Sequence, residues 1–169
     1  MSGLYSNRID TPKGVFLIIF HSKALARIYF PGQEPTSQYP LRKLPWETLE
    51  DDLKRYLCGE IIDWSSYPLD SSYYQPFTAK LLSTIKEIPH GEVWTYRESA
   101  ERAGSPKAWR AAGQALKANR HPIIVPCHRV VASGGKIGGF SGPPGWKQML
   151  LELEAGHKGA DDNAFFKRR

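Results

Sequence analysis

Two patterns of apolar and polar residues separate a first part of this chain from a second. Residues 14–20 form an almost unbroken apolar run, and residues 26–30 repeat it after a short polar interval. Apolar runs of this length, bounded by glycine and polar residues, predict the two strands of a hairpin. Residues 46–57 instead carry apolar side chains at helical spacing and stop before Gly59, which predicts a helix.

A stretch rich in serine, proline and aspartate, residues 65–72, then interrupts the apolar pattern. Such a composition is typical of a connection between domains. We therefore expect an α+β protein with a small β-rich amino-terminal domain over residues 1–66, a linker over residues 67–74 and a mainly helical domain over residues 75–169. The first helix of that domain is predicted from an apolar stripe formed by Phe77, Leu81, Leu82 and Ile85.

Two short helices are predicted next. Thr95 and Glu98 match a capping box, which predicts a helix over residues 96–103. Ser105 as N-cap, followed by a proline at the first helical position, predicts a second helix over residues 106–118. Two short helices joined by a tight turn make a helix-turn-helix, which by itself is weak evidence for DNA binding.

The second of these helices has one apolar and one polar side. The residues expected to face the core are Ala108, Ala112, Ala115 and Leu116. Arg110, Gln114 and Lys117 fall at i, i+4 and i+7 on the other side, with the small residues Ala111 and Gly113 between them. Because a DNA minor groove is only about 6 Å wide, a helix with small residues and one projecting arginine is suited to lie against it.

Charge is distributed unevenly. The formal net charge is +6, yet residues 102–151 contain no Asp or Glu. The cations of this window are Arg102, Lys107, Arg110, Lys117, Arg120, Arg129, Lys136 and Lys147. Because such a segment attracts polyanions, we favour nucleic acid as the partner over a solvated basic face.

Composition sets further bounds. With 169 residues, 41% of them hydrophobic, the chain can bury one sizeable core or two small ones. No segment approaches the roughly 20 apolar residues of a membrane span, and no signal-peptide pattern opens the sequence, so we expect a protein of the cytoplasm or nucleoid with no membrane partner. Cys58 and Cys127 lie far apart with no second Cys nearby, which predicts free thiols and no metal site.

The most informative pair is Cys127 and His128, which follow an apolar run and Pro126. A reactive cysteine needs a base, because the thiolate is the nucleophile and a neighbouring imidazole can lower the thiol pKa. Adjacent residues of a strand point to opposite faces, so the two side chains cooperate only if the chain turns sharply between them. The alternative interpretation is a small buried cysteine at the end of a core strand.

Several segments together resemble the O6-alkylguanine-DNA alkyltransferases. They are GEVWTY at residues 91–96, PKAWRA at residues 106–111, Asn119, and PIIVPCHRV at residues 122–130. The resemblance extends from Tyr73 to about His157, whereas the first 60 or so residues match only as a β-rich domain. It implies a ribonuclease H-like amino-terminal domain, a helix-turn-helix, and irreversible transfer of an alkyl group from guanine O6 in double-stranded DNA to the protein, once per molecule, by a monomer without cofactor.

The resemblance also implies residue roles. Cys127 is the acceptor, His128 polarises it through a water, and Glu154 holds the imidazole in a relay like that of serine hydrolases. Asn119 ties the recognition helix to the active-site turn, and Arg129 braces that turn. The residues implied to bind DNA through its minor groove and to flip the base are Tyr96, Ser105, Arg110, Ala111, Gly113 and Lys117, with Arg110 as the finger that fills the vacated stack. Those implied to line the substrate pocket are Pro122, Val130, Phe140, Ser141 and Gly142.

Three residues depart from the family pattern. Phe140 stands where several members have a tyrosine that can donate to guanine O6, and Trp109 and Gln114 replace small residues of the recognition helix. We interpret Trp109 as a packing residue, with contact to sugar or base as the alternative. The accepted alkyl size and any repair of O4-alkylthymine are left open.

Three other functions fit the residues less well than direct-reversal DNA repair. A non-catalytic alkyltransferase-like protein that binds DNA lesions would lack the acceptor thiol, which Cys127 supplies. A cysteine hydrolase would need an oxyanion hole, and nothing in the sequence identifies one. A sequence-reading regulator would need several base-reading side chains on its exposed helix, whereas this helix offers mostly alanine. The sequence therefore predicts a suicide methyltransferase.

Overall fold

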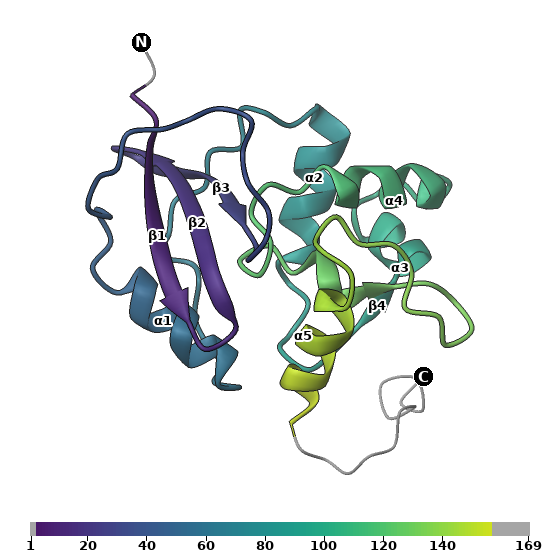
Figure 1. The fold of residues 1–169 in the computed structure, drawn as a ribbon. Coiled ribbons are helices and arrows are strands. Elements are labelled where there is room, and N and C mark those ends of the chain that lie inside the picture. The colour runs from purple at the N-terminus through teal and green to yellow at the C-terminus, as the bar shows by residue number, and fades with distance from the viewer. Residues whose placement is uncertain (1–2, 157–169) are drawn as a thin grey trace. The chain divides into compact units, whose positions relative to one another are not determined.

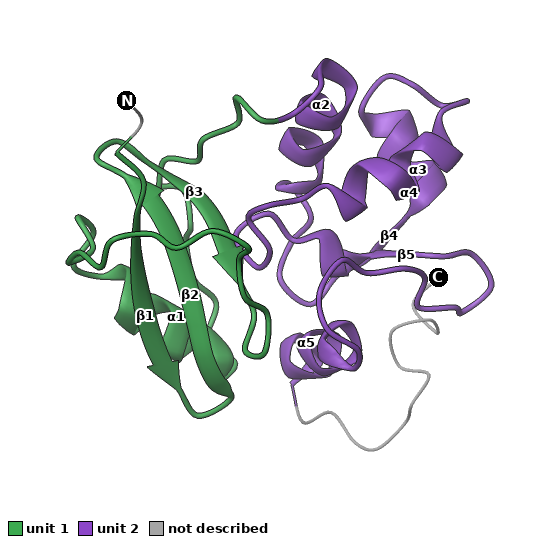
Figure 2. Ribbon diagram, turned by 45° about the horizontal axis from the view of Figure 1, so that its top comes forward, with its two compact units in different colours: residues 1–73 green, residues 74–169 purple. Residues whose placement is uncertain are grey.

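The computed structural model describes residues 3–156 (Figure 1). The chain divides into two compact units, with the boundary between Tyr73 and Tyr74 (Figure 2). The expected second domain ran to residue 169, and its tail from residue 157 onward lies outside the described residues. Within residues 3–156, no helix is long and apolar enough to cross a membrane.

The first unit is built on an antiparallel sheet with the strand order β1-β2-β3, formed by β1 (Tyr5–Thr11), β2 (Gly14–His21) and β3 (Ala24–Tyr29). The predicted hairpin is therefore confirmed as β2 and β3. The strand β1 was not predicted, because its sequence YSNRIDT is mostly polar and only Ser6 and Ile9 are buried.

The helix of the first unit, α1 (Leu49–Leu57), is shorter than predicted. The prediction began it at Trp46, but that side chain instead packs edge-on against the rings of Phe20 and Tyr67, at centroid distances of 6.1 and 6.5 Å. An aromatic residue at helical spacing can thus belong to the preceding loop when its ring reaches the same core.

The second unit contains four α-helices and two short strands within its described part. Its elements are α2 (Pro76–Ile85), β4 (Trp94–Thr95), α3 (Tyr96–Arg102), α4 (Trp109–Lys117), the 3-10 helix η1 (Cys127–Arg129), β5 (Val130–Val131) and α5 (Trp146–Ala155). The strands β4 and β5 pair in parallel, with Trp94 opposite Val130 and Thr95 opposite Val131. This pairing brings the start of α3 beside the end of η1, although more than thirty residues separate them in sequence.

The capping box of α3 is confirmed. The Glu98 N–H donates to Thr95 Oγ1 over 3.1 Å, and the Thr95 N–H donates to Glu98 Oε2 over 2.6 Å. Because each of the two side chains accepts the backbone N–H of the other residue, the start of α3 is fixed by local sequence alone. Tyr96, the first helical residue, therefore has a defined position.

The predicted start of the next helix is wrong. The helix α4 begins at Trp109 with Ala108 as N-cap, and Ser105 does not cap it. Residues 105–108 form a turn instead, closed by a hydrogen bond of 2.9 Å from the Ala108 N–H to the Ser105 carbonyl. A proline after serine suits the second position of a turn as well as the first position of a helix, and here the turn prevails.

Candidate active site

Cys127 lies in a sharp turn, as the pairing of a thiol with the adjacent imidazole requires. The 3-10 helix η1 is stabilised by a hydrogen bond of 2.8 Å from the Cys127 N–H to the Val125 carbonyl and one of 2.9 Å from the Arg129 N–H to the Pro126 carbonyl. Cys127 and His128 are both buried. The alternative interpretation, a cysteine that ends a core strand, is wrong because residues 123 and 124 form a turn, with an isolated bridge between Pro122 and Val125, and no strand leads to Cys127.

The environment of the thiol keeps it protonated in the resting protein. Burial raises the pKa of Cys127, while a hydrogen bond from Asn119, the charge of Lys147 and two backbone N–H groups act to lower it. The net direction is upward, so proximity to His128 does not produce a standing thiolate. A base must remove the proton during the reaction.

His128 and Glu154 form the pair that can supply this base. His128 Nε2 lies 2.7 Å from Glu154 Oε1, and both side chains are fully buried. Burial alone would raise the pKa of Glu154, but hydrogen bonds and charges from His128 and Arg129 hold it well below its usual range. Burial also lowers the pKa of His128, so the imidazole is neutral at neutral pH.

Arg129 holds the same carboxylate from a second direction. Its Nε donates to Glu154 Oε1 and Oε2 over 3.1 and 2.9 Å, and its Nη2 donates to Oε1 over 2.8 Å. Its Nη1 donates to the Ile88 carbonyl over 2.6 Å. Arg129 thus connects η1 with α5 and with the loop after α2. A fixed guanidinium fork of this kind restrains the carboxylate in one orientation.

Asn119 connects the end of α4 with the cysteine turn. Its Nδ2 donates to the Val125 carbonyl over 3.0 Å, and its Oδ1 accepts the His121 N–H over 3.0 Å. The same side chain acts to lower the pKa of the Cys127 thiol. One buried amide therefore joins the backbone at the two ends of the intervening loop, next to the cysteine turn.

Tyr96 lies against the glycine-rich loop that carries the expected pocket residues. The Gly139 N–H donates to Tyr96 Oη over 3.0 Å. Gly138 has a φ of +79°, and a Cβ there would lie 2.5 Å from Tyr96 Oη, so only glycine fits. Of the residues expected to line the pocket, Pro122 and Val130 are buried, and Phe140, Ser141 and Gly142 are partly buried.

The chain matches known proteins at this site and beyond it. Residues 76–156 match the family model described as 6-O-methylguanine DNA methyltransferase, DNA binding domain. A methylated-DNA–protein-cysteine methyltransferase of Haemophilus influenzae is 32% identical, covering 91% of this chain and 88% of the relative. One of Mycobacterium bovis is 33% identical, covering 96% and 99%. The chain belongs to the methylated-DNA–protein-cysteine methyltransferase family.

Solved structures of this methyltransferase family have the same fold. The Mycobacterium tuberculosis OGT in complex with DNA matches with a TM-score of 0.80 at 33% identity, covering 89% of this chain and 92% of that one. The O6-methylguanine-DNA methyltransferase of Pyrococcus kodakaraensis matches with a TM-score of 0.67 at 28% identity, covering 89% and 98%. The resemblance read from the sequence motifs is thus confirmed.

Lys147 also belongs to this methyltransferase site. The sequence analysis named it only as one of the cations of residues 102–151 and gave it no role in the site. It lies on α5 with 4% of its surface exposed, and its Nζ donates to the Val130 carbonyl over 2.6 Å and to the Gly139 carbonyl over 2.9 Å. Burial lowers the pKa of Lys147 to about 8. Its helical spacing was a usable signal, because Lys147 and Glu154 share the buried stripe with Leu150 and Leu151.

The exposed side of α4 carries the residues expected to contact DNA. The predicted core residues Ala112, Ala115 and Leu116 are buried, whereas Arg110, Ala111 and Lys117 are exposed. Gly113 is partly buried, as is Ser105 in the preceding turn. On this helix the predicted division into a core side and an exposed side is confirmed, except that Ala108, expected on the core side, is the N-cap and is only partly buried.

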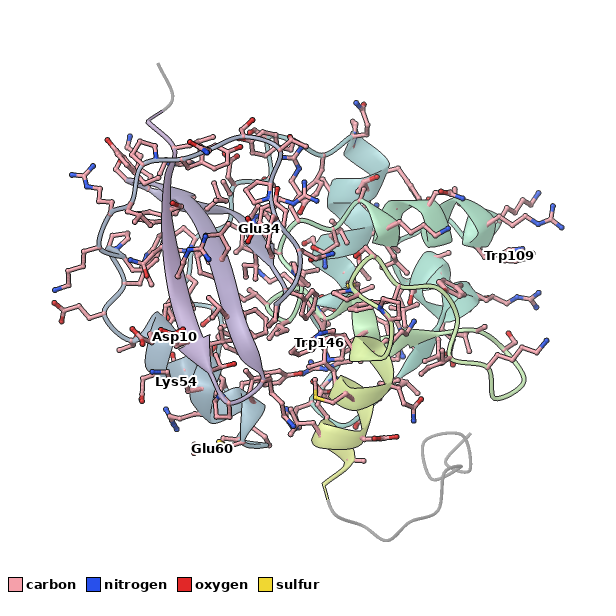
Figure 3. The ribbon with its side chains drawn as sticks, in the orientation of Figure 1. Asp10, Glu34, Lys54, Glu60, Trp109 and Trp146 are labelled. Atoms are coloured by element: carbon pink, nitrogen blue, oxygen red, sulfur yellow. The ribbon has the colours of Figure 1, made fainter. Side chains whose placement is uncertain are left out.

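Trp109 is 39% exposed and lies at the start of α4 (Figure 3). The Arg110 guanidinium lies 4.9 Å from the centroid of its ring. A cation this close to an indole is attracted to the ring face, by about 0.5–1 kcal/mol at an exposed site. Trp109 is therefore packed over only part of its surface, and the rest of the side chain is exposed to solvent.

Proposed function

We propose that this chain repairs DNA by direct reversal, transferring the alkyl group of O6-alkylguanine to the sulfur of Cys127. The observation that carries the proposal is the arrangement of a buried thiol, a neutral imidazole and an ionised carboxylate in one turn and one helix. The pair of His128 and Glu154 supplies a base whose orientation is fixed, and Asn119 and Lys147 stabilise negative charge on the sulfur.

The proposed chemistry uses His128 as the base. Because ionised Glu154 can only accept a hydrogen bond, His128 donates from Nε2 and keeps Nδ1 as its basic nitrogen. Nδ1 takes the thiol proton through a water. The sulfur then attacks the alkyl carbon, the bond from that carbon to O6 breaks, and its electron pair stays on guanine, which takes up a proton. The product is a thioether, so each molecule reacts once and needs no cofactor.

The alkylated guanine can reach a buried thiol only if its nucleotide leaves the duplex. We propose that α3 and α4 act as a helix-turn-helix that lies against the minor groove, and that Arg110 fills the space left in the stack. Small residues at Ala111 and Gly113 permit close approach, and Lys117 is suited to a phosphate contact. Tyr96, beside the pocket loop, would contact the flipped nucleotide.

The pocket residues keep the roles that the resemblance implies. The Val130 carbonyl and the Ser141 N–H would recognise the guanine edge, with Pro122, Phe140 and Gly142 around it. The Val130 carbonyl already accepts a hydrogen bond from Lys147, and its second lone pair can accept one from the base. We also propose a ribonuclease H-like amino-terminal domain, supported by the antiparallel β1-β2-β3 sheet followed by α1, and a monomeric cytoplasmic protein.

The test is transfer from DNA that contains O6-methylguanine. The intact protein should gain one methyl group, on the peptide that carries Cys127. Cys127→Ser should abolish transfer and leave DNA affinity nearly unchanged, because binding resides on α4 and chemistry on the thiol. Cys58→Ser is the matched control, since Cys58 is a free thiol at an exposed position and its loss should leave transfer intact. Methylation of Cys127→Ser at the wild-type rate would exclude the proposed acceptor.

A further inference from the structure

A second hydrogen-bonded cluster involves the segment that leads into the cysteine turn, and the proposed chemistry does not use it. His121 is fully buried, and its Nδ1 lies 2.8 Å from the hydroxyl of Tyr74. The two rings pack edge to face with centroids 5.9 Å apart. The Tyr74 hydroxyl also accepts the Arg120 N–H over 2.8 Å. One phenol oxygen thus holds two consecutive residues of the segment that leads from α4 to Cys127.

This cluster continues to the thiol through Asn119. The His121 N–H donates to Asn119 Oδ1, which orients the amide so that Nδ2 reaches the Val125 carbonyl. The Val125 carbonyl that accepts from this amide also accepts the Cys127 N–H over 2.8 Å, and the amide acts to lower the pKa of the Cys127 thiol. Rotation of the Asn119 side chain would therefore break its hydrogen bonds with the Val125 carbonyl and the His121 N–H. The hydrogen bonds that hold residues 120 and 121 thus restrain this rotation.

The loop that follows is strained, which explains why it needs such support. Ile123 has a φ of +74°, the one non-glycine residue with positive φ in the described chain, and it is β-branched and buried. A backbone of this kind is unfavourable for a β-branched residue and persists only where its surroundings over-determine it. The loop is closed by a hydrogen bond of 2.8 Å from the Val125 N–H to the His121 carbonyl. His121 is thus held at its ring by Tyr74 and at its backbone by the strained loop.

We propose that Tyr74 and His121 are positioning residues for alkyl transfer. They hold the segment after α4 so that the Asn119 amide stays directed at the Cys127 sulfur. The inference rests on the proposed function for its consequence in repair. Its mechanical part, control of the thiol through Asn119, can be measured on the thiol alone.

The test variant is Tyr74→Phe, which keeps the ring and removes the hydroxyl. Transfer should slow by about two- to tenfold, the loss expected when a buried hydrogen bond is removed. The slowing should be equal for alkylated duplex DNA and for the free O6-benzylguanine base, because the hinge acts on the thiol and not on DNA. Tyr73→Phe is the matched control at the adjacent, exposed tyrosine and should transfer at the wild-type rate.

A pH profile separates positioning from mere stability. Alkylation of Cys127 by iodoacetamide should shift to higher pH in Tyr74→Phe, since a displaced Asn119 no longer lowers the thiol pKa. His121→Phe should shift the profile in the same direction, and His121→Asn, which retains an acceptor near the Nδ1 position, should restore most of the wild-type behaviour. A profile identical to wild type in Tyr74→Phe, with or without a lower melting temperature, would overturn the proposal.

Failure of the proposed function would look different. If wild-type protein did not take an alkyl group from DNA or from the free base, the repair proposal would fall. The pH profile for alkylation of Cys127 by iodoacetamide could still be compared between wild type and Tyr74→Phe, and a shift or its absence would still decide the positioning role. The two outcomes are therefore independent.

Discussion

His128 and Glu154 are joined by a hydrogen bond of 2.7 Å between Nε2 and Oε1, inside a site where both side chains are fully buried. Because burial keeps the imidazole neutral, the contact is a hydrogen bond to a charged group, which typically contributes about 1.5–3 kcal/mol. The pair therefore contributes to the stability of the fold as well as to the removal of the thiol proton. Both contributions depend on pH.

Acid should destabilise the protein through both partners. The pKa of Glu154 lies below its ordinary 4.5, so the stability that the carboxylate contributes is present above pH 4.5 and is lost as pH falls further. Burial lowers the pKa of His128 from its ordinary 6.5, so below pH 6.5 the unfolded chain takes up a proton that the folded chain does not. The melting temperature should fall as pH is lowered from neutral through these values.

The variant that checks this prediction is Glu154→Gln. It should be less stable at neutral pH and should lose less further stability below pH 4.5, because the titrating carboxylate is gone. Glu152→Gln, at an exposed position of the same helix, is the control and should follow the wild-type pH dependence. Parallel curves for Glu154→Gln and wild type would contradict the assignment.

Lys147→Met should slow alkyl transfer at neutral pH. The change removes the positive charge that lowers the thiol pKa. It also removes the hydrogen bonds that Lys147 Nζ donates to the Val130 and Gly139 carbonyls. Each unit by which the thiol pKa rises lowers the thiolate population roughly tenfold at a given pH below the pKa. The slowing should appear with the free base as well as with DNA. Lys136→Met, at an exposed lysine of the adjoining loop, should react at the wild-type rate.

Arg110→Ala should slow repair of duplex DNA far more than reaction with a free alkylated guanine base. A finger that fills the vacated stack is needed only where a stack exists. Lys117→Ala is the comparison on the same helix: it should weaken DNA binding modestly and reduce its salt dependence, as expected of one phosphate contact. Measuring both rates for each variant decides the matter, and equal slowing of the two substrates by Arg110→Ala would remove Arg110 from this role.

Local sequence predicted those parts of the fold whose interactions are local. The α3 helix followed from Thr95 and Glu98, which are three residues apart and satisfy each other's backbone groups. The start of α4 did not follow, since a serine and a proline serve a turn and a helix equally well. The strand β1 was missed because pairing with β2, and not its own apolar content, makes it a strand.

The candidate site was predicted through its motif, and its long-range contacts were not. Lys147 counted as one cation among many, because only the fold brings it beside Val130, seventeen residues earlier in the chain. Tyr74 and His121 lie 47 residues apart, and nothing in either segment indicates the other. Their roles follow from burial and hydrogen-bond geometry, which a single sequence does not contain.

Alkylation of Cys127 should lower the stability of the protein. The sulfur lies in a buried turn, so a new methyl group must displace packed neighbours. Overpacking of this kind typically costs about 1–3 kcal/mol. For a chain of this size each kcal/mol lowers the melting temperature by about 2–4 °C. A benzyl group should lower it further.

The same strain should weaken DNA binding after repair. The methyl group adds bulk to a sulfur that lies beside the Asn119 amide, so we expect the bond from that amide to the Val125 carbonyl to weaken and the segment between α4 and η1 to lose one of its restraints. We expect the methylated protein to bind duplex DNA less tightly than the free protein, by gel shift on the same preparation. A melting temperature unchanged after stoichiometric methylation, and unchanged again after benzylation, would show that the pocket absorbs the adduct and that this coupling is absent.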